Sequence, residues 1–167
     1  MVLGEVSTAD FLAVRFAIAT VFCGIVFFSQ IRRLDGVAWR RAIGMGVLYG
    51  AGQLLQTQGL TTTPAAVSGF ITGLYVVLTP ICAALLLKAR TAPRVWVAAG
   101  LATAGLGLLS LNGSLGVGTG ELLTIASALV YSVHIVAVSH WSTPSTAVGS
   151  SVVQMLVITV MSGAAAL

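Results

Sequence analysis

Polar side chains recur at helical spacing inside long apolar segments, and these residues could bind a solute. One set is Tyr49, Gln53 and Gln56, a second is Ser68, Thr72, Tyr75 and Thr79, and a third is Thr124, Ser127, Tyr131 and His134. Steps of three and four residues place each set on one face of a helix. An unpaired amide in hydrocarbon costs on the order of a few kcal/mol, so these faces are expected to meet polar partners.

Each polar stripe has two interpretations. The glutamines could hydrogen-bond a neighbouring helix, or they could contact a solute in a membrane path. His134 could be a packing residue, or it could line the path and be reached from water. Asp and Glu are absent from the central part of every predicted span, so His134 is the one plausible intramembrane proton carrier.

Two more polar residues, Arg15 and Gln154, occupy similar depths in spans of opposite predicted orientation. The short motifs Ser7-Thr8-Ala9 and Ser145-Thr146-Ala147 precede them, as in a repeat. For Arg15 the alternatives are snorkelling to the headgroups and pairing with Asp10. The candidates for the substrate pathway are Arg15, Tyr49, Gln53, Gln56, Thr72, Tyr75, Thr79, Tyr131, His134 and Gln154.

The sequence gives little support for catalysis, metal binding or nucleotide binding. A nucleophile, a base and an orienting partner do not occur together at helical spacing, so no catalytic residue is predicted and the protein is not expected to be an enzyme. Cys23 and Cys82 lie in apolar segments without metal-ligand spacing. A phosphate-binding G-x-x-x-x-G-K-[ST] loop is absent too. We therefore expect no metal and no cofactor.

The elements that must position the polar residues are membrane helices. The 167 residues are 57% hydrophobic and 7% charged, with a mean hydropathy of +1.05. The charge-free stretch 65–87 is the clearest span, and Pro80 within it leaves the carbonyl of Val76 without its amide donor. Six spans are predicted, at 11–29, 42–60, 65–87, 95–111, 122–138 and 146–167, with a turn at Asn112-Gly113-Ser114. Small residues predicted to pack helices closely are Gly46, Gly50, Ala65, Gly69, Gly73 and Gly100.

The basic residues predict the orientation of these spans. Arginines and lysines collect in loops 30–41 and 88–94, which are therefore expected to be cytoplasmic, and loops 61–64 and 112–121 are expected outside. Because the bases sit in short loops, nucleic acid is not an expected partner. Residues 1–10 carry acids where a signal peptide has bases, so no cleaved leader is predicted. Both ends are expected to be cuts within a longer protein.

Residues 59–66 and 69–80, the latter reading GFITGLYVVLTP, resemble the third loop and fourth helix of EamA-type permeases of the drug/metabolite transporter superfamily. The resemblance implies two five-helix repeats in a ten-helix fold. Residues 1–113 would be a first repeat lacking its first helix, and residues 114–167 the truncated start of a second, inverted repeat.

The resemblance also implies a function. It implies a secondary transporter of small metabolites or drug-like molecules, with alternating access and a midplane site, in the inner (plasma) membrane. Its partners would be membrane lipids, a small-molecule substrate, and a second copy or a complementing permease half. The alternative is a non-transporting fragment or helper subunit that packs against a complete permease through its glycine-rich faces.

Overall fold

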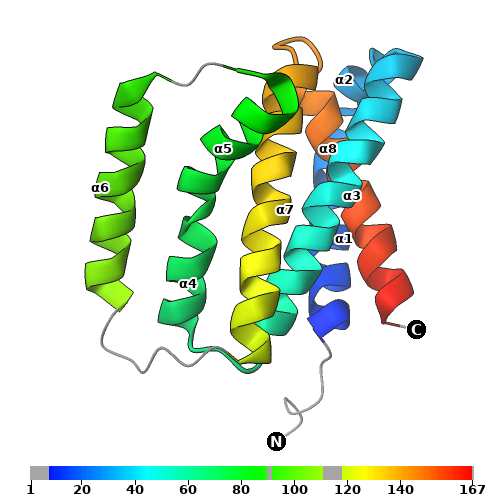
Figure 1. Ribbon diagram of the computed structural model, residues 1–167. Coiled ribbons are helices and arrows are strands. Elements are labelled where there is room, and N and C mark those ends of the chain that lie inside the picture. Colours follow the sequence, from blue (N-terminus) through cyan, green and yellow to red (C-terminus); the bar gives the residue numbers. More distant parts are fainter. Residues whose placement is uncertain (1–7, 90–91, 111–117, 167) are drawn as a thin grey trace, which may run out of the picture. The chain divides into compact units, whose positions relative to one another are not determined.

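The computed structural model describes residues 8–89, 92–110 and 118–166, and these residues form eight helices and no strand (Figure 1). The helices are α1 Thr8–Val26, α2 Phe28–Arg32, α3 Gly36–Gly59, α4 Ala65–Gly73, α5 Tyr75–Leu87, α6 Pro93–Ser110, α7 Thr119–Trp141 and α8 Ala147–Ala165. The predicted all-α class is therefore confirmed.

Within the described ranges, three helical segments are long and apolar enough to cross a membrane. They are Ala65–Leu87, Thr119–Trp141 and Ala147–Ala165, with mean hydropathies of 2.3, 1.9 and 1.6 over an 18-residue stretch of each. Helices also occupy the other three predicted ranges, but the count of six spans and the inverted repeat stay predictions. The predicted turn at Asn112-Gly113-Ser114 and the predicted repeat boundary at 113/114 lie outside the described residues.

The 65–87 segment is interrupted at Leu74, six residues before Pro80. There the Leu74 amide donates to the Ile71 carbonyl at 3.1 Å and the Val77 amide to the Leu74 carbonyl at 2.9 Å, which are short three-residue turns. Gly73 directly precedes the break and is a poor helix former. Pro80 itself lies inside α5 and is buried. Pro80 predicts a distortion at Val76, whereas the helix breaks at Leu74, where the sequence carries no proline.

The chain divides into two compact units. Unit 1 comprises residues 1–54 and 137–167. In it α8 packs along α1 and against α2. Apolar side chains fill two small cores, one of Leu12, Phe16 and Ile158 from α1 and α8, and one of Leu34, Ala42, Met45, Ala137 and Val153, which adds residues of α3, α7 and the α2–α3 connection.

Glycines let α3 approach α8 closely within unit 1. A methyl group added at Gly46 would lie 2.8 Å from Cβ of Val157, and one at Gly50 would lie 2.9 Å from the sulfur of Met161. At Gly46 the close atoms include the Cα of Gln154, so a larger residue does not fit there unless α3 and α8 move apart, whereas at Gly50 the flexible Met161 side chain would have to shift.

Unit 2 comprises residues 55–136. In it α6 lies alongside α4 and α5 (Figure 1). The C-terminal turn of α3 meets the start of α7, where a methyl group at Gly59 would lie 2.6 Å from the Thr124 hydroxyl oxygen. A methyl group added at Gly120 would likewise contact the hydroxyl oxygens of Thr62 and Thr63. These contacts tie α7 to α3 through small residues.

Exposure follows the pattern of a membrane protein, with apolar side chains outside and hydroxyls inside. Along α1, large apolar residues at helical spacing are 54–75% exposed: Phe11, Val14, Ile18, Phe22 and Ile25. Buried polar residues are mostly serines and threonines, namely Thr63, Ser68, Thr124, Ser127, Ser132, Ser150, Gln154 and Ser162. Water would penalise the exposed stripe, whereas lipid tails would not.

Candidate solute site

Three of the candidate residues meet in unit 2, although they come from three different helices. The Gln56 side chain on α3 donates from Nε2 to the Thr72 hydroxyl on α4 at 3.0 Å. The Tyr131 hydroxyl on α7 donates to Oε1 of Gln56 at 2.9 Å. We call Gln56, Thr72 and Tyr131 the Gln56 cluster. It joins residues 75 positions apart in the chain.

The Gln56 cluster is neutral and keeps unused hydrogen-bonding capacity. The Gln56 amide has a second N–H, and the Thr72 hydroxyl, which accepts from Gln56, has its own proton to donate. Gln56 and Thr72 are half-buried and Tyr131 is 9% exposed. A polar group of a solute could therefore exchange bonds with these side chains, and none of the three is a charged group that would demand a counter-ion.

A second polar group lies on α3 within unit 1. Gln53 donates from Nε2 to the Tyr49 hydroxyl at 3.0 Å, which is a bond within one helix at a spacing of four. The Tyr49 ring meets Phe16 edge to face, with ring centroids 6.2 Å apart. The exposed Arg15 guanidinium carbon lies 5.4 Å from the centroid of the Phe16 ring. Arg15 is thus held beside an aromatic ring at the surface of unit 1.

The remaining candidates lie on α5, α7 and α8. On α5, the Thr79 hydroxyl donates to the Tyr75 carbonyl at 2.6 Å, and both residues are half-buried. His134 on α7 is half-buried. Gln154 on α8, in unit 1, is 8% exposed. Its Cα would lie 3.1 Å from a methyl group at Gly46, so it belongs to the α3–α8 contact.

The polar stripe along α7 divides into two parts. Thr124 and Ser127 are 0% exposed, and their hydroxyls donate to carbonyls of their own helix, those of Gly120 and Thr124, at 2.9 and 3.0 Å. Backbone carbonyls are the usual acceptors for hydroxyls in apolar helices. These two hydroxyls therefore do not face a solute in this structure, whereas Tyr131 bonds to another helix.

The small residues predicted to pack helices fall into two groups, one in close contact with another helix and one exposed or half-buried in this structure. Gly46 and Gly50 lie directly against α8. Ala65, Gly69 and Gly100 are exposed, and methyl groups at Gly69 and Gly100 would meet no atom within 4 Å. Gly73 is half-buried. Close packing at Ala65, Gly69, Gly73 and Gly100 stays a prediction.

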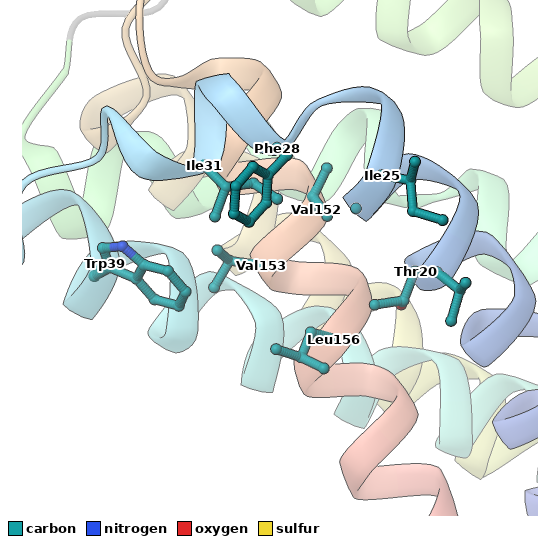
Figure 2. Close-up of a pocket in the computed structure, with 10 residues that line it drawn as sticks. Thr20, Ile25, Phe28, Ile31, Trp39, Val152, Val153 and Leu156 are labelled. Atoms are coloured by element: carbon teal, nitrogen blue, oxygen red, sulfur yellow. The ribbon is translucent and has the colours of Figure 1, made fainter.

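Sequence reasoning missed an apolar pocket of about 630 Å³ in unit 1. Figure 2 shows side chains of α1, α2, α3 and α8 facing this space. Its walls are Thr20, Val21, Gly24, Ile25, Phe28, Ile31, Trp39, Val152, Val153 and Leu156. At Thr20, the hydroxyl is 3.2 Å from that of Thr159. The candidate residues are absent from its walls, and the apolar stripe of α1 was the one signal that could have indicated it.

Titratable residues do not gather into a metal site: the described ranges contain no group of three or more His, Cys, Asp or Glu that could hold an ion. Cys23 and Cys82 are half-buried free thiols.

Long apolar helices, exposed apolar side chains and hydroxyls turned inward define a multi-pass helical membrane protein. The model of the EamA-like transporter family matches residues 1–111, and the chain belongs to this family. The matched segment contains Gln56 and Thr72 of the Gln56 cluster, whereas Tyr131 lies beyond it.

A curated relative is named an uncharacterized transporter and comes from Archaeoglobus fulgidus. It is 33% identical to this chain over 140 residues, which are 84% of this chain and 42% of the relative. The chain thus spans about two fifths of the length of that relative. No solved structure matches the chain.

Proposed function

We propose that this chain is part of a secondary transporter that exports small metabolites or drug-like molecules across the inner (plasma) membrane. Membership of the EamA-like transporter family and the similarity to a protein named a transporter support this proposal. A gradient would drive transport, since the sequence has no phosphate-binding loop for ATP.

The observation that carries the proposal is the Gln56 cluster. Its hydrogen bonds connect α3, α4 and α7, so a solute that bonds to Gln56 would compete with contacts between helices. A solute with hydroxyl, amide or carbonyl groups would replace one neutral hydrogen bond by another, at a net cost of about 1 kcal/mol or less per exchange. Such an exchange suits binding that is reversible on both sides of a membrane.

The other path candidates have proposed roles as well. Tyr75 and Thr79 on α5, and Tyr49 and Gln53 on α3, would offer further polar groups to a solute along their own helices. His134 would carry the coupled proton, and Arg15 and Gln154 would occupy matching places in two inverted repeats that gate alternately.

Thr72→Val tests the site in the complete natural protein, reconstituted in liposomes and assayed against a metabolite panel. The change keeps the volume of the side chain and removes the hydroxyl that accepts from Gln56, so the KM for a transported solute should change. Thr103→Val is the matched control because the Thr103 hydroxyl donates to the Ala99 carbonyl of its own helix, α6, at 2.8 Å. Equal effects of the two substitutions on KM would refute the site.

A helper subunit is the second candidate function. Its specific support is the open small-residue surface at Ala65, Gly69 and Gly100, which could seat a helix of a second copy or of a complete permease. Gly69→Leu should then abolish copurification of the chain with that partner while leaving the fold of the chain intact. The helper function would be excluded if the complete protein transports a solute without a partner and Gly69→Leu leaves this transport unchanged.

A further inference from the structure

A second pocket in unit 1 differs in character from the apolar one. It measures about 340 Å³ and is lined by Val37, Arg40, Arg41, Gly44 and Trp141. The first four come from the N-terminal half of α3, and Trp141 ends α7. The candidate solute residues are absent from its walls, so its chemistry must be considered separately.

The two guanidinium groups at this pocket are available to a ligand. Arg40 and Arg41 are exposed, and within the described ranges neither forms an ion pair. Asp35 is the one acid in the 30–41 loop, and its carboxylate accepts from the Ala38 amide at 2.7 Å, which caps the start of α3. The acid is therefore engaged with the helix, and two positive charges face the pocket.

The rest of the lining gives the pocket an apolar side. Val37 and Trp141 line it, and a methyl group at Gly44 would lie 3.9 Å from Cζ3 of the Trp141 indole, so glycine keeps this space open. One turn further along α3, on the face of Arg40 and Gly44, Val47 is 45% exposed. The surface thus passes from two arginines to an indole beside Gly44 and then to Val47 over about two helical turns.

This order of groups matches an amphiphile at the membrane surface. Arginine binds phosphate oxygens in bidentate geometry, and indole rings are favoured at the level of the headgroups. The positive charge of the loop predicts that it faces the cytoplasm, where anionic lipids attract basic residues. A soluble phosphate compound would use the arginines but not the apolar surface below them.

We propose that the pocket of Arg40, Arg41 and Trp141 binds the phosphate headgroup of an anionic phospholipid of the cytoplasmic leaflet. The headgroup phosphate lies between the two guanidinium groups and the acyl chains follow the exposed apolar face of α3. The site is independent of the proposed solute site, because its residues take no part in the Gln56 cluster.

The test counts lipids bound to the complete natural protein in detergent by native mass spectrometry, with phosphatidylglycerol or phosphatidylcholine added. Wild type should bind phosphatidylglycerol in preference. Arg40→Gln and Arg41→Gln should each weaken this binding about fivefold. Arg94→Gln removes the same charge from an exposed site on α6 that lines neither pocket, and it should leave binding unchanged.

Three results would overturn the proposal. The first is equal binding of the two lipids by wild type, and the second is an equal loss in Arg94→Gln, which would mean that only net charge matters. The third is displacement of phosphatidylglycerol by millimolar inorganic phosphate, which would assign the pocket to soluble phosphate. As a control for folding, the melting temperature of each variant is measured in phosphatidylcholine and should equal that of wild type. Phosphatidylglycerol binding by Arg40→Gln and Arg41→Gln should fall even though these variants melt normally.

Discussion

Gly46→Ala should destabilise the protein because it inserts one methyl group into the closest contact between α3 and α8. That methyl would lie 2.8 Å from Cβ of Val157 and 3.1 Å from Cα of Gln154. Both atoms are part of or next to the backbone of α8, so a change of rotamer cannot relieve the clash. Overpacking of this kind costs about 1–3 kcal/mol.

Gly69→Ala is the matched control because a methyl group there meets no atom within 4 Å. Both changes replace glycine by alanine inside a helix, and each gains about 1 kcal/mol in helix propensity. This gain cancels in the comparison, so Gly46→Ala should be less stable than Gly69→Ala by about 1–3 kcal/mol. Unfolding of the purified variants in mild detergent, followed by circular dichroism, measures the difference. Equal stabilities would refute the close α3–α8 contact.

Three further predictions concern α7 and the loops. Gly120→Ala should also destabilise the protein, by about 1–3 kcal/mol. The added methyl group would contact the Thr62 and Thr63 hydroxyls and lie 2.8 Å from the Gly59 carbonyl oxygen. A melting temperature at the wild-type value would count against this. In a cysteine-free background, an impermeant thiol reagent added outside should label a cysteine at position 116 and not one at position 36; the reverse would invert the predicted orientation. His134→Gln should flatten the pH dependence of transport if His134 carries the coupled proton, and an unchanged profile with normal expression would make it a packing residue.

The helices were predictable from the sequence because the length and hydropathy of a segment identify a membrane span. The uncharged 65–87 segment is the clearest example, and all six predicted ranges contain helix. The break at Leu74 was not predictable in the same way. Pro80 is the stronger helix breaker by residue type, yet α5 continues through it and the turn forms after Gly73.

The candidate site was predictable in its residue types but not in its pairings. Spacing places Gln56, Thr72 and Tyr131 on polar helix faces, but only the packing of helices decides that these three meet. The same spacing grouped Thr124 and Ser127 with Tyr131, although their hydroxyls bond to their own backbone. A Ser or Thr can satisfy itself within its helix, whereas Gln and Tyr reach further, so the longer side chains were the better guides.

The most direct test of the proposed transport site is the accessibility of position 72. In a cysteine-free version of the complete natural protein, Thr72→Cys should react with impermeant thiol reagents from either side of the membrane, and a transported solute should slow the reaction. Thr124→Cys, at a position that is 0% exposed, should stay unreactive. Failure of the cysteine at 72 to react from either side, while a cysteine in a loop reacts, would contradict the proposal that the Gln56 cluster lies on an alternating-access path.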